Sequence, residues 1–228
     1  MSQGWKGFTQ AIWLLAAAAS APAAMADTPA GPVLYSYDVT LPGFGRIGTY
    51  ETRITPQGTR TEVETEIEVE VKVAFVTAFS LSADRREVWE DGRLVAFDGT
   101  TTKNGEVIRL EAEAGEDTLV VDGPRGTDTV APDVVTFNPW STHVLDADLA
   151  MSPEHGGTWP IAVSPGGEGE IELGAETLDV RHYRIEGEEP SDLWFDADGR
   201  PVRFSIEEDG RTLTFTLAPE RSAYSVPE

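Results

Sequence analysis

The stretch that decides the fold reads RTEVETEIEVEVKVAFVTAFSLSA and occupies residues 60–83. Its odd positions from Val63 to Leu81 are apolar or threonine, whereas the even positions from Glu62 to Glu70 are all glutamate. Successive side chains of a β-strand point to opposite faces, so this period predicts an antiparallel sheet wetted on one face. One straight strand of this length would span about 80 Å at about 3.3 Å per residue, which is far too long. We therefore expect a bend near 74–78, where the even positions become small or apolar and the outer surface should be covered.

Alternation with the same period extends over most of the chain, and turn dipeptides such as Asp91-Gly92 and Asn104-Gly105 separate the runs. The segment 131–156 interrupts the pattern with three prolines. Apolar residues recur there at helical spacing, which predicts a helix at about 139–150. The expected strands are 33–41, 46–54, 60–73, 75–90, 93–101, 106–113, 118–122, 159–164, 169–173, 176–186, 192–196, 201–208 and 211–217.

The first 26 residues have the layout of a secretory signal peptide. Lys6 supplies a positive start, an apolar run follows at 11–19, and Ala24-Met25-Ala26 is a cleavage site of the A-x-A type. The apolar run is shorter than the roughly 20 residues that span a bilayer, so we expect cleavage and no stable membrane anchor. We predict a periplasmic protein in which 27–228 form a single β-rich domain with a helical insertion at about 132–156. The chain has no cysteine, which excludes disulfides and lipid attachment at a cysteine.

The charge balance excludes several classes of partner. The chain has 17 Lys and Arg against 40 Asp and Glu, for a formal net charge of −23. A protein that binds a nucleic-acid backbone needs a basic surface, so we expect no nucleic-acid partner. The same argument disfavours a polybasic contact with anionic lipids. The glutamate row at 62–70 is interpreted as the solvated outer face of a sheet, because carboxylates along one flat strand do not converge on a cation.

Motifs for catalysis and metal binding are missing from the sequence. The three histidines, His143, His155 and His182, lack the close spacing of zinc ligands. No GxSxG nucleophile motif occurs, and Ser141 and His143 lie two apart on the expected helix, so their side chains should point in different directions. We therefore predict a protein that is not an enzyme, with no catalytic residue, no metal ligand and no cofactor.

Several short segments occur in a characteristic order: Tyr35-Ser-Tyr-Asp-Val, Arg46-Ile-Gly-Thr-Tyr, Val88-Trp-Glu-Asp-Gly-Arg-Leu-Val, Asn138-Pro-Trp-Ser, Arg181-His-Tyr-Arg and Leu193-Trp-Phe-Asp-Ala-Asp-Gly-Arg. This order resembles a bacterial family of exported proteins of unknown function. That family is itself similar to the periplasmic lipoprotein-carrier half-barrels of the LolA and LolB type. The resemblance implies a mainly β fold, in which a curved antiparallel sheet or half-barrel has one helix packed near its concave face. In the carriers such a concave face holds lipid acyl chains.

Aromatic residues spread over both halves suggest a cavity for an apolar ligand, with Trp140 on the helix as its lid or plug. A plain packed core remains the alternative interpretation of the same residues. The leading hypothesis is a periplasmic, non-catalytic protein that binds or transfers a lipid-like ligand. The alternative is a structural or adaptor domain that binds an envelope protein through a sheet edge or its acidic face. The candidate ligand-binding residues are Phe75, Phe79, Trp89, Phe97, Trp140, Trp159, Tyr183 and Trp194.

Overall fold

A computed structural model describes residues 31–208 and 210–224, and the proposed signal peptide lies outside this part of the chain. The described residues are mainly β, with 69% in strands and 4% in helices. The elements are β1 (Val33–Leu41), β2 (Gly45–Gln57), β3 (Arg60–Val73), β4 (Val76–Glu90), β5 (Arg93–Lys103), β6 (Glu106–Ala114), β7 (Leu119–Gly123), β8 (Gly126–Val130), β9 (Val135–Thr136), η1 (Thr142–Asp146), β10 (Leu149–Met151), β11 (Thr158–Pro160), β12 (Ala162–Leu173), β13 (Glu176–Glu186), β14 (Ser191–Phe195), β15 (Pro201–Glu208), β16 (Arg211–Leu217), η2 (Pro219–Arg221) and β17 (Ala223–Tyr224).

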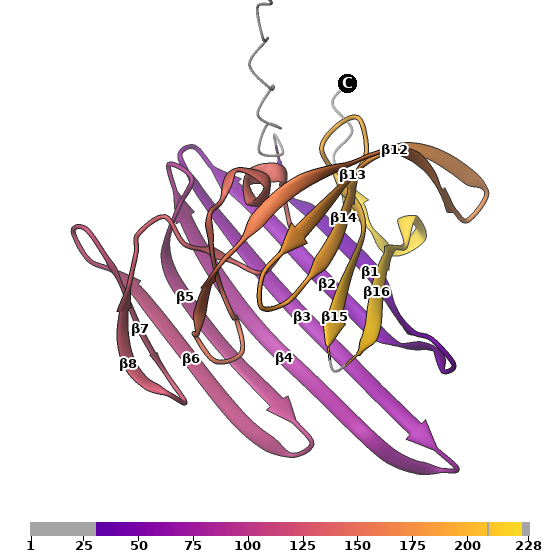
Figure 1. The fold of residues 1–228 in the computed structure, drawn as a ribbon, viewed down its shortest axis with the longest axis horizontal. Coiled ribbons are helices and arrows are strands. Elements are labelled where there is room, and N and C mark those ends of the chain that lie inside the picture. The colour runs from indigo at the N-terminus through magenta and orange to yellow at the C-terminus, as the bar shows by residue number, and fades with distance from the viewer. Residues whose placement is uncertain (1–30, 209, 225–228) are drawn as a thin grey trace, which may run out of the picture.

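One large antiparallel sheet runs in the order β12-β13-β14-β15-β16-β1-β2-β3-β4-β5-β6-β7-β8, and β17 pairs with β1. Pairing of β1 with β16 brings together two strands that are far apart in sequence. The sheet curves strongly but does not close, because β8 and β12 are both edges (Figure 1). The predicted fold class, a curved antiparallel sheet with one helix near its concave face, is confirmed.

The segment between the two halves of the sheet, 131–161, crosses the concave face and is called the crossover segment below. It holds a small sheet in the order β11-β10-β9 and the short 3₁₀-helix η1. The predicted helix at about 139–150 is therefore reduced to five residues, and its C-terminal part forms β10 instead. Ser141 caps η1, and Ala147 returns to extended backbone directly after it. The apolar residues at helical spacing all face the same core. A 3₁₀ turn followed by a strand places them there as well as a helix would.

Most predicted strands occur within a few residues of their expected bounds. The strands predicted at 159–164 and 169–173 have the wrong bounds. The first prediction covers the end of β11, which stops at Pro160, and the start of β12 at Ala162. Strand β12 then continues through an irregularity at Pro165–Gly167 and includes the second predicted strand. Strand β8 was not predicted. Its residues 126–129 are exposed and Val130 is buried, so no alternation of apolar side chains marks this strand.

The stretch 60–83 forms the hairpin of β3 and β4, with Glu66 opposite Asp84 and Val69 opposite Leu81. The bend predicted near 74–78 is the hairpin turn, in which Ala74 and Phe75 have φ values of 47° and 72°. The expectation that this part is covered is wrong, because Phe75 is fully exposed. The turn projects beyond the neighbouring elements, so no strand or helix reaches it (Figure 1).

Candidate functional site

The eight aromatic residues proposed as ligand contacts do not share one hollow. Trp89, Phe97, Trp140 and Trp159 are each at most 7% exposed and belong to the packed core. Phe79 and Tyr183 are half-buried around that core, and Phe75 lies at the exposed hairpin turn. The ring of Trp194 is stacked on His182, with centroids 4.7 Å apart. Trp194 is half-buried against the core, as Phe79 and Tyr183 are. The sequence pattern identified the aromatic core but could not separate its members from the exposed Phe75.

The concave interior beneath the crossover segment is filled. An apolar hollow between this segment and β13–β15 has a volume of only about 10 Å³. A space of that size barely admits one water molecule and cannot admit an acyl chain. Its lining residues are Phe137, Asn138, Pro139, Val144, Ile185, Ser191, Leu193, Phe204 and Ile206.

Trp140 is a core residue and not a movable lid. Its ring lies 5.8 Å from that of Trp89 and 4.7 Å from that of His143, measured between centroids. His143 also contacts the ring of Trp89 at 4.7 Å, so the two tryptophans enclose the imidazole. These contacts join η1 to β4. The interpretation of Trp140 as a plug therefore fails, because the space beneath it is occupied by side chains.

Ser141 and His143 are in contact, contrary to the expectation that they point apart. The Ser141 Oγ atom lies 2.5 Å from Nδ1 of His143, because the backbone at Ser141 is extended and only His143 belongs to η1. Burial lowers the pKa of His143 to about 4, so its imidazole is a weak base. The other ring nitrogen, Nε2, is buried without a hydrogen-bond partner among the described residues. Asp146 is exposed, and within the described part of the chain no hydrogen bond joins it to the imidazole as in a catalytic triad.

Lowering the pH from 6.5 to 4 should destabilise the fold by about 3 kcal/mol through His143. Its folded pKa lies below the unfolded value, so its contribution is present above the unfolded pKa and is lost as the pH falls through the folded pKa. Urea unfolding at several pH values should show this loss in the unaltered protein and not in His143→Gln. His155→Gln is the control, because burial lowers the pKa of His155 too but that ring is more exposed. Equal pH dependence in the unaltered protein and His143→Gln would contradict the prediction.

A buried carboxylate on β4 connects the sheet to the crossover segment. Glu87 is 1% exposed and accepts hydrogen bonds from Trp89 Nε1 at 2.9 Å, Thr136 Oγ1 at 2.8 Å and Asn138 Nδ2 at 2.9 Å. Tyr50 OH donates to Asn138 Oδ1 at 2.6 Å and extends the network to β2. Burial raises the pKa of Glu87, although the three hydrogen bonds act in the opposite direction.

Sequence reasoning missed this network, although one signal was available. Leu81, Ala83 and Trp89 mark the inner face of β4, and Arg85 and Glu87 fall on the same odd positions. A charged residue on an apolar face is unusual and calls for buried partners. The sequence did not show where those partners come from. Arg85 is half-buried, and its buried Nε atom lacks a partner among the described residues.

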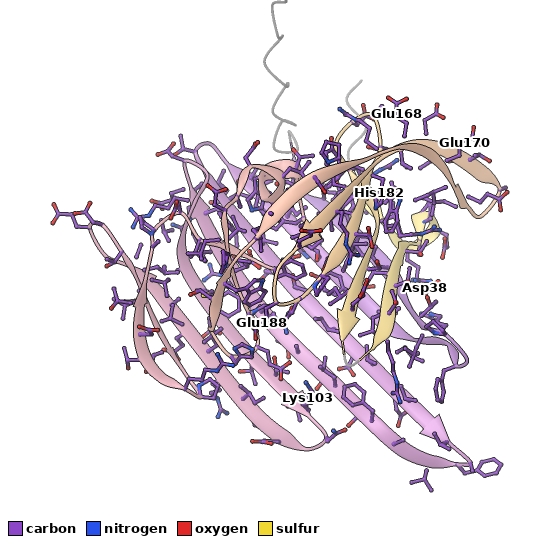
Figure 2. The ribbon with its side chains drawn as sticks, viewed as in Figure 1. Asp38, Lys103, Glu168, Glu170, His182 and Glu188 are labelled. Carbon is purple, nitrogen blue, oxygen red and sulfur yellow. The ribbon has the colours of Figure 1, made fainter. Side chains whose placement is uncertain are left out.

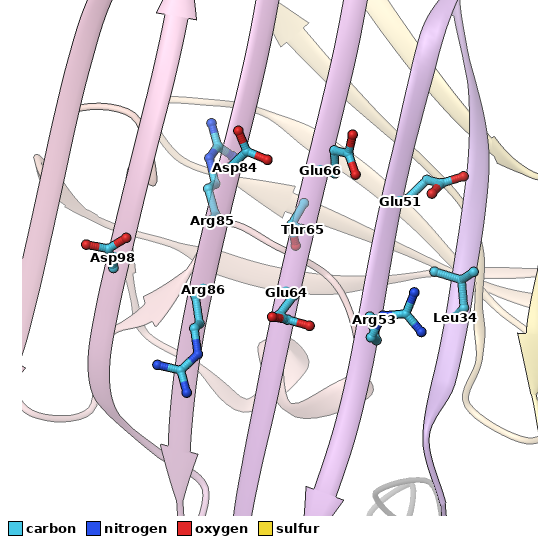
Figure 3. Close-up of a pocket in the computed structure, with 10 residues that line it drawn as sticks. All are labelled: Leu34, Glu51, Arg53, Glu64, Thr65, Glu66, Asp84, Arg85, Arg86 and Asp98. Atoms are coloured by element: carbon cyan, nitrogen blue, oxygen red, sulfur yellow. The ribbon is translucent and has the colours of Figure 1, made fainter.

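The outer face of β1–β5 has a polar hollow with a volume of about 340 Å³ (Figure 3). Cross-strand register places Glu51, Glu66 and Asp84 in one row. In the next row Glu64 lies between Arg53 and Arg86, so charges of opposite sign alternate. Within the described residues, no group of three or more His, Asp or Glu side chains is arranged to hold a metal ion. The geometry is that of a solvated, partly charge-compensated surface, as the sequence indicated for the glutamate row.

Apolar surface remains at the end of the sheet that the crossover segment does not cover. Here β3 and β4 extend beyond β15 and β16 (Figure 1). The half-buried side chains around this end are called the open-end strip. The register pairs Val69 with Leu81 and Ile206 with Leu213. The strip consists of Val69, Phe79 and Leu81 on β3 and β4 and of Ile206 and Leu213 on β15 and β16, all packed against the core. Ile206 also borders the small hollow beneath the crossover segment.

No helix in the described part of the chain has both the length and the apolar character needed to cross a membrane. The sequence matches no curated protein significantly. Among solved structures, a β-barrel-like protein of the domain of unknown function DUF1849 from Brucella abortus superposes with a TM-score of 0.62 at 11% identity, covering 88% of this chain and 100% of that one. That likeness concerns the fold alone.

Two further solved structures match at lower TM-scores. A DUF1089 family protein from Pseudomonas aeruginosa has a TM-score of 0.36 at 13% identity, covering 67% of this chain and 87% of that one. LprF from Mycobacterium bovis has a TM-score of 0.30 at 13% identity, covering 88% of this chain and 90% of that one. The family model for a domain of unknown function, DUF6134, matches residues 37–218, from β1 to the end of β16. This match covers more than half of the chain and most of the curved sheet, so the chain belongs to the DUF6134 family.

Proposed function

We propose that this protein is a non-catalytic component of the cell envelope that binds a lipid-like ligand on the open-end strip. The observation that carries the proposal is the contrast between a filled interior and half-buried apolar side chains at one uncovered end of the sheet. Desolvation would supply the affinity, since burying apolar surface contributes about 25 cal/mol per Å². The ligand would lie along the strip and would not enter the core. Export to the periplasm is part of this proposal and rests on the layout of residues 1–26.

Replacing Leu81 with serine should weaken binding of a fluorescent fatty acid about tenfold, because apolar contact area is lost from the strip. Leu81 is half-buried and borders the core without being part of it, so the fold should tolerate the change. The readout is displacement of the fluorescent fatty acid, with the free energy of unfolding measured alongside.

Val120→Ser is the matched control, because Val120 is an apolar residue on β7 that is 40% exposed and lies outside the strip. Native mass spectrometry of protein purified from the envelope should show a co-purified lipid. Fatty-acid affinity that is equal in Leu81→Ser and Val120→Ser would remove the strip as the binding site.

An adaptor role is the second candidate, and the long edge strand β12 favours it. Among the described strands, β12 pairs only with β13, and its residues from Ser164 to Glu170 are exposed. An extended segment of a partner could add to such an edge through main-chain hydrogen bonds. A lipid-free mass, together with an envelope protein that crosslinks specifically to residues of β12, would favour this function over the first.

A further inference from the structure

Exposed large apolar side chains cluster at one end of the sheet. The turns of the hairpins β1–β2, β3–β4 and β5–β6 all lie at this end (Figure 1). Among the described residues, six large apolar side chains are exposed, and all but Val120 lie in or next to these turns. The set is called the hairpin rim and consists of Phe44 (47% exposed), Val73 (52%), Phe75 (102%), Val76 (67%) and Val107 (50%).

The charge pattern of the rim differs from that of the rest of the chain. Although the protein has 40 acidic residues, none occurs within 39–50 or within 71–83. Each of these windows holds one cation, Arg46 or Lys72, and Lys103 lies beside the third turn (Figure 2). Two of the three apolar turns therefore lack acidic residues, although the chain as a whole is strongly acidic.

The three cations are already paired with acids outside the turns. Arg46 is paired with Asp38. The Nζ atom of Lys72 lies 2.5 Å from Glu70, and that of Lys103 lies 3.3 Å from Glu154. These charges are therefore compensated, so attraction to an anionic surface is weak. The rim suits a surface that is apolar and electrically neutral on average.

The backbone of the β3–β4 turn is strained by the residues that occupy it. Ala74 and Phe75 both have positive φ, a conformation that asparagine and glycine adopt readily in this kind of turn. The ring of Phe75 is fully exposed, so contacts within the fold do not repay this strain. Backbone strain that no contact within the fold explains indicates that Phe75 has a function other than stabilising the fold.

We propose that the hairpin rim docks reversibly on the surface of a neutral lipid bilayer, with Phe75 inserted at the interface. The rim spans β1 to β6, about 24 Å at about 4.8 Å per strand, which fits an extended surface better than a pocket. Apolar turn residues enter the boundary between headgroups and acyl chains, while the paired cations remain at headgroup level. The rim shares no residue with the open-end strip, so the proposal does not require the ligand proposed above.

Phe75→Gly tests the proposal because it should weaken membrane binding while it raises the stability of the fold. Loss of the ring should lower partitioning onto phosphatidylcholine vesicles about tenfold in a flotation assay. The same change relieves the positive φ and should raise the midpoint of urea unfolding. Val120→Ser, remote from the rim, is the control and should float like the unaltered protein. All variants share the same N-terminal segment, so differences between them report on the rim.

The charge of the protein supplies a second measurement. With a net charge of −23, binding should be weaker to vesicles that also contain phosphatidylglycerol, and added salt should remove this difference. Vesicle binding that is unchanged in Phe75→Gly would overturn the proposal, as would no flotation of the unaltered protein. A concentration-dependent dimer that Phe75→Gly abolishes would assign the rim to a contact between copies and would also overturn it. Fatty-acid binding should remain intact in Phe75→Gly, which separates this test from that of the open-end strip.

Discussion

Replacing Glu87 with alanine should lower the free energy of unfolding by about 4 kcal/mol. The change leaves Trp89 Nε1, Thr136 Oγ1 and Asn138 Nδ2 without their shared acceptor in a place that water does not reach. A buried donor without a partner costs about 1–3 kcal/mol, and the missing side chain also leaves a void. Urea unfolding at neutral pH measures the loss.

Glu87→Gln should be less damaging, with a loss of about 2 kcal/mol. It preserves the volume, but its amide nitrogen must face either the Asn138 amide or the Trp89 indole, which are both donors. Asp84→Ala is the matched control, because Asp84 is an exposed acid on the opposite face of the same strand. It should change stability by no more than about 0.5 kcal/mol. If Glu87→Ala were as stable as this control, the network would not hold the crossover segment to the sheet.

Replacing Trp140 with alanine should destabilise the fold by about 4 kcal/mol, because a large buried aromatic side chain is removed from a packed cluster. Trp89 and His143 would both lose a neighbour, and the hollow created is too well enclosed to collapse fully. Thermal and urea unfolding measure the effect. The interpretation of Trp140 as a ligand lid predicts the opposite, a stable variant with weaker ligand binding.

Two comparisons make the Trp140 test specific. Trp140→Phe keeps an aromatic ring in the cluster and should recover more than half of the lost stability. Phe44→Ala removes an aromatic side chain that is 47% exposed and should have little effect on unfolding. A Trp140→Ala variant that unfolds like the unaltered protein but binds a fluorescent fatty acid more weakly would restore the lid interpretation.

The β class and most strand positions follow from the sequence because alternation is a local property. In 60–73, for example, the apolar face and the glutamate face are both determined by neighbours two residues apart. The dipeptides Asp91-Gly92 and Asn104-Gly105 likewise mark turns through their own backbone preferences. The shortness of η1 was not predictable, because tertiary packing decided between a helix and a strand for apolar residues that face the same core.

The tertiary structure alone decided which residues meet. Glu87 lies 49 residues from Thr136 and 51 from Asn138, and only the path of the crossover segment over the concave face brings them together. The tertiary structure also decided that Trp140 is buried in the interior and Phe75 is exposed. Both are aromatic residues with apolar neighbours in the sequence. Local alternation determines which face of a strand a side chain occupies. Whether that face is covered depends on long-range pairing, such as that of β1 with β16, which no local pattern encodes.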